Sequence, residues 1–204
     1  MKKVAIIDYG MGNLDSVKRA IEECGGNAFI TKNPKDLNIA THIILPGVGS
    51  FYDGMNNFLK SGYSDELREQ AIHNRIPILG ICLGMQILAD TGYEIKETQG
   101  LGLIHGIVKK FQPKNGERVP HVGWNEINIL AEHPLIKNIK NGSNFYFVHS
   151  YYFSCTDKTN VIATTDYCSN FASVIVNDNI MGTQFHPEKS QKTGFQLLNN
   201  FLAL

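Results

Sequence analysis

In the first half of the chain, short hydrophobic runs alternate with stretches that have a helical period. The runs predict strands over 4–8, 27–31, 42–45 and 76–81. The runs at 4–8 and 76–81 are nearly all apolar, which predicts strands that are covered on both faces. Between two of the runs, Leu14, Val17 and Ile21 fall on one helical face, and Gly25 and Gly26 then end the helix. A second helix is predicted over 65–73 and a short one over 85–90. This half of the chain therefore predicts strands joined by helices.

Beyond residue 100 the pattern changes to closely spaced strands with turn residues between them. The predicted strands are 101–111, 125–130, 144–153, 160–165, 172–177 and 180–185, and a last helix spans 193–202. Together the two halves predict an α/β fold, a three-layer open sheet with a parallel centre and a mixed, antiparallel extension. No linker or repeat interrupts residues 1–204, so we expect a single domain, with its site at the carboxyl ends of the strands.

Composition and charge narrow the class of protein. Because 19 basic side chains balance 19 acidic ones, the chain has no general field that would attract nucleic acid or an anionic membrane. No apolar stretch is long enough to span a bilayer. The four cysteines are far apart and form no CxxC pair, which favours a reduced, cytoplasmic protein without disulfides or zinc. We expect no metal and no cofactor.

One cysteine lies in a sequence that is typical of a nucleophile. Cys82 follows a predicted buried strand, precedes a helical stretch and has Gly80 and Gly84 on its two sides. This pattern predicts a tight strand-to-helix turn that presents the thiol above the sheet. The helix N-terminus favours a thiolate, and the amide of Leu83 points to the place where an oxyanion would form. Cys24, Cys155 and Cys168 lack this context and are interpreted as packing residues.

A thiol nucleophile needs a base, and one histidine has a suitable neighbour. His186 lies at the end of a predicted strand, and Glu188 follows two residues later, so their side chains share a side of the extended segment. Alone, this pair is equally well explained as a surface histidine beside a solvated carboxylate. With Cys82 it predicts a Cys-His-Glu triad. The Pro46-Gly47-Val48-Gly49 turn follows another buried strand and would supply a second oxyanion donor, the Val48 amide. Taken by itself, this sequence is better explained as a purely structural turn.

These segments resemble the class I, triad-type glutamine amidotransferases. Five blocks resemble, more narrowly, the glutaminase subunits of imidazole glycerol phosphate synthases: 7–13 (Ile-Asp-Tyr-Gly-Met-Gly-Asn), 46–51 (Pro-Gly-Val-Gly-Ser-Phe), 119–125 (Val-Pro-His-Val-Gly-Trp-Asn), 146–151 (Tyr-Phe-Val-His-Ser-Tyr) and 185–190 (Phe-His-Pro-Glu-Lys-Ser). They occur in the expected order from residue 6 to the last helix.

The resemblance implies a role for each matching residue. Cys82 would attack the side-chain amide of glutamine, His186 oriented by Glu188 would transfer protons, and ammonia and glutamate would be released. The oxyanion would be held by the backbone of Leu83 and Val48. The residues implied to bind glutamine are Gly49, Gln86, Ser150 and Tyr151.

The resemblance also implies a partner, a (β/α)8-barrel cyclase subunit that forms a heterodimer with this chain. The cyclase would use the ammonia to make imidazole glycerol phosphate and an aminoimidazole carboxamide ribotide in histidine biosynthesis. The residues implied to lie at the interface are His121, Trp124 and Asn125.

Two places depart from the expected pattern, and three alternatives stay open. His105 replaces an expected proline, and segment 90–97 has no close match. A related glutaminase subunit would instead feed a synthase that adds amidino groups to surface sugars. A stand-alone cysteine hydrolase or chaperone-like protein would use a similar sheet, and a non-catalytic scaffold would keep the fold alone.

Overall fold

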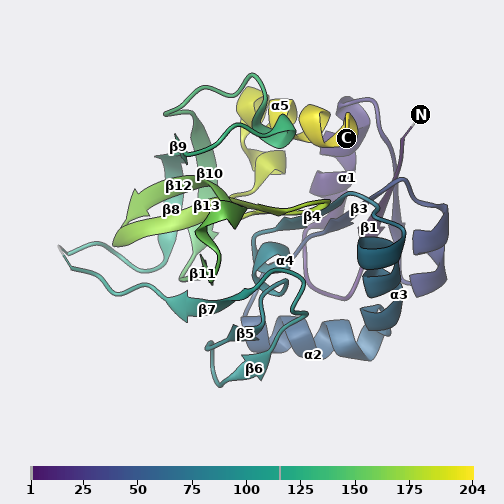
Figure 1. Ribbon diagram of the computed structural model, residues 1–204, viewed down its shortest axis with the longest axis horizontal. Helices are drawn as coiled ribbons and strands as arrows, with labels where there is room; N and C mark the ends of the chain where they lie inside the picture. Colours follow the sequence, from purple (N-terminus) through teal and green to yellow (C-terminus); the bar gives the residue numbers. More distant parts are fainter. Residues whose placement is uncertain (1, 115) are drawn as a thin grey trace.

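The computed structural model describes residues 2–114 and 116–204, and its centre is an eight-stranded sheet in the order β2-β1-β3-β4-β14-β13-β12-β9 (Figure 1). These strands are β1 (Lys3–Ile7), β2 (Asn27–Thr31), β3 (His42–Leu45), β4 (Ile78–Ile81), β9 (Asn128–Ile129), β12 (Val161–Tyr167), β13 (Ser169–Asn177) and β14 (Ile180–Thr183). The pairs from β2 to β14 are parallel and those from β14 to β9 antiparallel. The predicted α/β sheet with a parallel centre and an antiparallel extension is confirmed.

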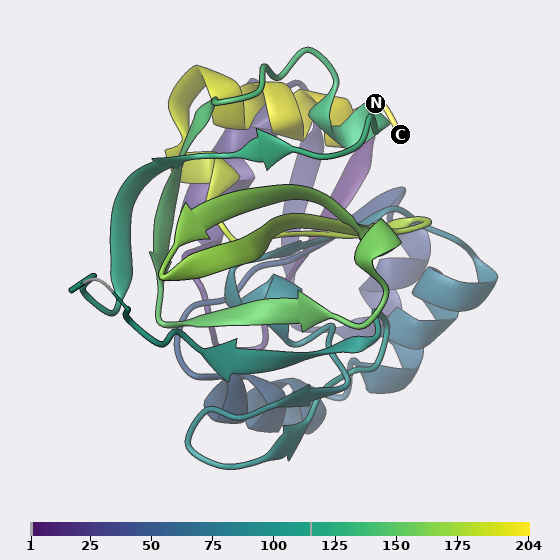
Figure 2. The same ribbon diagram turned by 60° about the vertical axis from the view of Figure 1, so that its left-hand side comes forward.

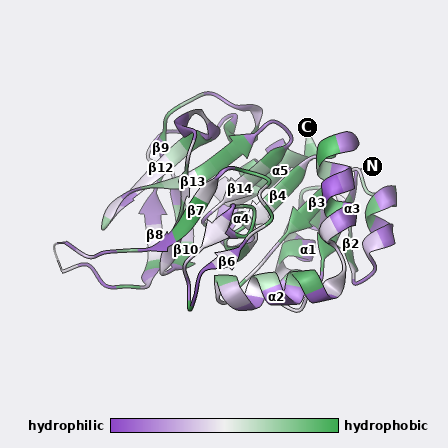
Figure 3. Cartoon of the chain, turned by 60° about the horizontal axis from the view of Figure 1, so that its bottom comes forward, coloured by the Kyte–Doolittle hydropathy of each residue, from purple (hydrophilic) through white to green (hydrophobic). Residues whose placement is uncertain are grey.

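Helices cover both faces of the sheet and give the three layers. On one face, α1 (Leu14–Glu23) and α5 (Gln191–Leu202) contribute Val17, Ile21 and Leu198 to a core with the strand residues. On the other, α2 (Phe51–Ser61) and α3 (Ser64–Arg68) contribute Phe58 and Leu67 to a second core. The strands between the layers are strongly hydrophobic (Figure 3), because a strand buried on both faces has no polar side.

Two smaller sheets extend the molecule beside the antiparallel strands (Figure 2). In one, β8 (His121–Glu126) pairs antiparallel with β10 (Asn144–His149). The other has the order β11-β7-β5-β6, with β5 (Thr91–Gly92), β6 (Thr98–Gln99), β7 (Gly106–Lys110) and β11 (Tyr151–Cys155). Both lie next to the carboxyl end of β4, so they wall one side of the place where the site was expected.

Several elements differ from the sequence-based expectation. Helix α2 was not predicted, because Gly54 and the asparagines after it weaken the hydrophobic period. The expected helix over 65–73 is α3 followed by a π-helical turn, η2 (Glu69–His73). The helix expected over 85–90 is the shorter α4 (Leu83–Gln86). Short 3-10 turns complete the chain: η1 (Pro34–Ile39), η3 (Pro134–Ile136), η4 (Lys158–Asn160) and η5 (Pro187–Lys189).

Across the described residues, none of the helices combines the length and the apolar character that crossing a membrane requires.

Candidate active site

Cys82 lies on the tight turn between β4 and α4, and its backbone is strained. Its φ of 54° and ψ of −108° are values that a residue with a side chain seldom adopts. The turn fits only because its neighbours are glycines. A Cβ on Gly84 would lie 1.7 Å from the carbonyl oxygen of Leu45, and one on Gly80 would lie 2.7 Å from the backbone of Gly84. The glycines that flank Cys82 therefore allow the predicted nucleophile turn.

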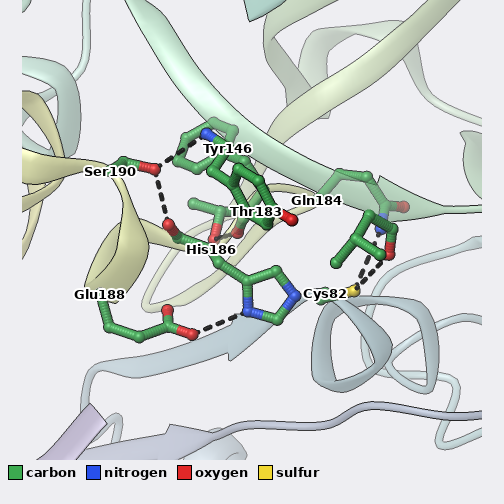
Figure 4. A network of polar contacts seen from close by, with 9 residues as sticks. Cys82, Tyr146, Thr183, Gln184, His186, Glu188 and Ser190 are labelled. Atoms are coloured by element: carbon green, nitrogen blue, oxygen red, sulfur yellow. Dashed lines mark hydrogen bonds and ion pairs between the residues drawn. The ribbon is translucent and has the colours of Figure 1, made fainter. Parts of the chain in front are cut away.

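His186 and Glu188 follow β14, the strand that pairs with β4. His186 Nδ1 lies 2.8 Å from Glu188 Oε1, and both side chains are buried. Two hydrogen bonds fix the histidine backbone: His186 N donates to Tyr146 O at 2.9 Å, and Ser190 Oγ donates to His186 O at 2.6 Å. The other ring nitrogen, Nε2, faces the Cys82 sulfur (Figure 4) and has no hydrogen-bond partner among the described residues. The ring is thus oriented by the carboxylate and aimed at the thiol.

The charges around His186 favour its protonated form. Burial alone would lower its pKa, but a negative charge on Cys82 and the contact with Glu188 raise the pKa to about 10. An imidazolium beside a sulfur stabilises a thiolate, which is the nucleophilic form of cysteine. The three side chains therefore have the geometry and the charge for attack on a carbonyl carbon.

Two further groups contact the Cys82 sulfur. The side-chain amide of Gln184 donates to it at 3.7 Å (Figure 4). The Val148 carbonyl oxygen lies 3.9 Å from the sulfur. Gln184 is fully buried. Sequence reasoning did not single it out, although it stands two residues before His186 and therefore on the same side of the strand end.

The backbone amide expected to bind the oxyanion is already hydrogen-bonded within the protein. The Leu83 amide donates to the Gly47 carbonyl oxygen at 3.3 Å, so this donor already has a partner. The Gly47 carbonyl and the Val48 amide belong to the same planar peptide. One rotation of that peptide would therefore free the Leu83 amide and reorient the Val48 amide. A Cβ on Gly47 would lie 2.3 Å from the Tyr9 hydroxyl, so this position has no room for a side chain.

A cavity of about 310 Å³ opens beside the thiol. It brings together seven of the residues expected from the sequence: Val48, Gly49, Cys82, Leu83, Gln86, Ser150 and Tyr151. His186 and Glu188 lie behind Cys82, outside this lining. Because Gln86 Nε2 donates to Tyr151 O at 2.8 Å, its amide braces the wall of the cavity as well as facing it.

Glu94 also lines the cavity, and sequence reasoning missed it. It comes from the segment without a close match, between β5 and β6. Its Oε2 accepts from the Phe51 amide, at the first turn of α2, at 2.7 Å. Burial is the main cause that raises the pKa of this carboxyl. His105, the other departure, is exposed, and its Nδ1 lies 3.0 Å from Asp90 Oδ1.

The three residues expected at a partner interface lie on β8, but they do not face the same way. Trp124 is 48% exposed, as is its neighbour Val122 at 57%, whereas His121 is only 3% exposed. In a strand, alternate residues point to opposite faces, so His121 and Asn125 lie on the side away from Trp124. His121 stacks on Tyr167 with ring centroids 3.9 Å apart and offers no surface to a partner.

No group of three or more histidine, cysteine, aspartate or glutamate side chains suited to a metal ion occurs within residues 2–114 and 116–204. All four cysteines are free thiols.

Comparison with known proteins assigns a family to this site. The family described as "Glutamine amidotransferase class-I" matches residues 5–204. The chain is 49% identical to imidazole glycerol phosphate synthase subunit HisH 1 of Campylobacter jejuni strain RM1221, over 98% of this chain and all of that protein. It is 47% identical to imidazole glycerol phosphate synthase subunit HisH of Methanosarcina acetivorans, over the whole of both chains. The fold is similar to that of PurLQS from Thermotoga maritima, with a TM-score of 0.75, 19% identity and coverage of 100% of this chain and 99% of the other.

The charge coupling between Cys82 and His186 predicts the titration of the imidazole. Replacing Cys82 by serine removes the negative charge, so the pKa of His186 falls below about 10. NMR of ¹⁵N-labelled histidine would follow both rings. His149 is the internal control: burial is the main cause that lowers its pKa to about 3, and it stays neutral in both proteins. An unchanged His186 titration in Cys82→Ser would contradict the coupling.

Proposed function

Because the chain belongs to the class I glutamine amidotransferases, and within them to the HisH subunits of imidazole glycerol phosphate synthase, we propose that Cys82, His186 and Glu188 carry out its glutamine hydrolysis. The protein is the glutaminase subunit that supplies ammonia for imidazole glycerol phosphate formation in histidine biosynthesis. The observation that carries the assignment of residues is a thiol on a strained turn, faced by an imidazole whose other nitrogen lies 2.8 Å from a carboxylate.

The reaction proceeds through a thioester. The Cys82 thiolate attacks the side-chain amide carbon of glutamine and forms a tetrahedral oxyanion. Collapse of this intermediate breaks the carbon–nitrogen bond, and His186 gives its proton to the departing ammonia. Neutral His186 then takes a proton from water, which attacks the thioester. Glutamate leaves as the carbon–sulfur bond breaks, which restores the Cys82 thiolate and protonated His186. Glu188 holds the imidazole in one orientation throughout.

The oxyanion needs donors that the resting structure does not offer. Its first donor, the Leu83 amide, is occupied by the Gly47 carbonyl oxygen. Rotation of the Gly47–Val48 peptide removes this carbonyl and brings the Val48 amide to the oxyanion as second donor. The resting chain is therefore a slow glutaminase, because loss of one such donor costs about 10²–10³ in rate.

Glutamine is held in the cavity by its amino-acid end. The Glu94 carboxylate, fixed by the Phe51 amide, attracts the α-ammonium group. The backbone of Gly49, Ser150 and Tyr151, together with Gln86, forms the rest of the binding surface. This set places the side-chain amide of the substrate toward Cys82.

The ammonia passes to a (β/α)8-barrel cyclase subunit in a heterodimer. Trp124 and Val122 on β8 are exposed and hydrophobic, and a large aromatic of this kind is a common interface anchor. Val122 takes the place of His121 in the expected interface set, since His121 is buried. We further propose that the whole chain is one domain and that it acts in the cytoplasm.

The function is tested by glutamate release in the presence of the histidine-pathway cyclase and its ribotide substrate. We expect stimulation of the wild-type chain and loss of at least 10³-fold in Cys82→Ala, because the nucleophile is gone. Cys24→Ala is the matched control and keeps the wild-type rate. Turnover in Cys82→Ala would refute the triad, and stimulation only by a surface-sugar synthase would assign the chain to that pathway.

A pair of variants at one position tests the oxyanion donor. Val48→Pro removes the amide hydrogen and lowers the stimulated kcat by about 10²-fold, whereas Val48→Ala keeps it and stays near wild type. Steady-state kinetics with the cyclase would measure both, and circular dichroism would check that both fold. Equal kcat values for the two variants would exclude the Val48 amide as a donor.

Substitution of Glu94 tests how the substrate is held. Glu94→Gln keeps the shape but removes the charge, so KM for glutamine rises by about tenfold or more while kcat changes less. Glu97→Gln, in the same segment but outside the cavity, is the control. A change in kcat alone would show that Glu94 does not act through substrate binding.

A further inference from the structure

A continuous series of hydrogen bonds joins strand β8 to the Cys82 sulfur. Its members, in order, are the Asn125 amide, His121, His149, the Tyr151 carbonyl, Gln86, Gln184 and Cys82. We call it the Asn125–Cys82 chain. All of its side chains except that of Asn125 are buried, each with less than 7% of the residue exposed. His149, Tyr151, Gln86 and Cys82 of this series also line the cavity.

The outer half follows from strand pairing. His121 and His149 are directly opposite each other in the β8–β10 register, and His121 Nδ1 lies 3.2 Å from His149 Nε2. Asn125 stands four residues from His121 on the same side of β8, and its Nδ2 lies 3.3 Å from His121 Nε2. The outward side of the same strand carries Trp124. Strand β8 therefore carries a hydrophobic surface on its outer side and the start of the Asn125–Cys82 chain on its inner side.

The donors and acceptors of the outer half have one consistent direction. The Tyr151 carbonyl can only accept, so His149 Nδ1, 2.8 Å away, carries the hydrogen. Burial lowers the pKa of His149 to about 3 and that of His121 to about 4, so both rings are neutral. His149 Nε2 is then an acceptor, and His121 Nδ1 donates to it. His121 Nε2 in turn accepts from Asn125, whose Oδ1 is engaged by the Glu126 amide at 2.8 Å.

The inner half meets the outer half at the Tyr151 carbonyl, which accepts from Gln86 as well as from His149. Gln86 Nε2 donates to Tyr151 O and also, at 3.0 Å, to Gln184 Oε1. Because its oxygen accepts from Gln86, the nitrogen of Gln184 is turned toward Cys82 Sγ at 3.7 Å. A reversed Gln184 amide would set its oxygen against a thiolate and its nitrogen against a donor. The orientation of Gln184 therefore depends on Gln86, and that of Gln86 on the Tyr151 carbonyl.

Packing holds the two imidazoles in place. His121 lies between Tyr167 and Phe147, with ring centroids 3.9 and 4.9 Å away. His149 has Phe111 and Phe171 each at 5.1 Å. Two neutral imidazoles in such surroundings cost desolvation that apolar side chains would avoid. Rings that are held this tightly cannot turn independently, so a change at one end of the series is passed on rather than absorbed.

We propose that the Asn125–Cys82 chain positions the Cys82 sulfur for reaction and makes its geometry depend on strand β8. Asn125 and His121 are then positioning residues, which act through their neighbours, whereas Gln184 contacts the sulfur directly. None of the three lines the cavity. The proposal rests on the proposed function, in which Cys82 is the nucleophile and β8 meets the cyclase. A displacement of β8 relative to β10 lengthens the His121–His149 hydrogen bond and, through His149, moves the Tyr151 carbonyl to which Gln86 donates.

The first test uses the free chain, without cyclase or glutamine. In the wild type, ¹⁵N NMR should find both His121 and His149 protonated at Nδ1. Asn125→Leu removes the donor to His121 Nε2, so the ¹⁵N shift of that nitrogen should change while His121 stays protonated at Nδ1. Alkylation of Cys82 by iodoacetamide at pH 7, identified by peptide mass, should slow about threefold. Asn128→Leu is the control: it loses a bond to Asp166 on the neighbouring strand and contacts neither imidazole. Unchanged alkylation in Asn125→Leu would overturn the proposal.

The second test asks whether Asn125 and Gln184 affect the Cys82 sulfur through the same series of hydrogen bonds. Gln184→Met keeps the volume and removes the donor to sulfur, so alkylation should fall about tenfold, as expected for loss of a hydrogen bond to a charged group. In the double variant that combines Asn125→Leu with Gln184→Met, Cys82 should be alkylated no more slowly than in Gln184→Met alone, because Asn125 acts through Gln184. If the two substitutions slow alkylation additively, Asn125 and Gln184 act independently, and the Asn125–Cys82 chain is refuted. His121→Phe, which keeps the stacking, gives the same comparison if Gln184→Met does not fold.

The third measurement connects the chain to turnover and separates the two proposals. With cyclase and ribotide, Asn125→Leu should lower kcat for glutamine by at least threefold with little change in KM, whereas Asn128→Leu should match the wild type. A rise in KM alone would refute a positioning role. If the wild type alkylates and titrates as expected but releases no glutamate with any synthase, the proposed function fails while the positioning proposal stands.

Discussion

The contact between the turn at Cys82 and the loop that follows β3 is the constraint on which the rest of the site depends. Gly84 packs so tightly on the Leu45 carbonyl that even a methyl group would not fit. This approach allows the left-handed backbone of Cys82, brings the Leu83 amide to the Gly47 carbonyl and opens the cavity beside the thiol. The proposed nucleophile, oxyanion donors and substrate pocket thus share a single point of close backbone packing.

The same fold gives its imidazoles opposite charge states through their neighbours. His121 and His149 are surrounded by aromatic rings and carbonyls, and burial lowers the pKa of both. His186 is buried as well, but the negative charges at Cys82 and Glu188 reverse the outcome. Neutral rings suit a directed hydrogen-bond series, and a protonated ring suits a thiolate. Burial alone therefore does not decide what a histidine does in this molecule.

Sequence patterns were informative where one local rule decides the structure and uninformative where distant contacts do. The glycines around Cys82 and the spacing of His186 and Glu188 sufficed to predict the turn and the pair, because both are local. Glu94 could not be found, since it reaches the cavity from a hairpin turn that has no motif of its own. The grouping of His121 with Trp124 ignored strand alternation, a rule that would have separated them. The bond between Leu83 and Gly47 depends on the orientation of one peptide, which no residue pattern specifies.

The shared peptide of Gly47 and Val48 has a consequence for how much glutamine the cell loses to idle hydrolysis. In the proposed mechanism, the blocking Gly47 carbonyl and the Val48 amide lie on one planar peptide, so they change place together. The idle hydrolysis expected of an unpartnered subunit is then set by the equilibrium share of molecules with this peptide turned. Restricting that share to one in a hundred takes only about 2.7 kcal/mol. The orientation of one loop peptide can therefore limit hydrolysis of glutamine by the unpartnered subunit without any change in Cys82, His186 or Glu188.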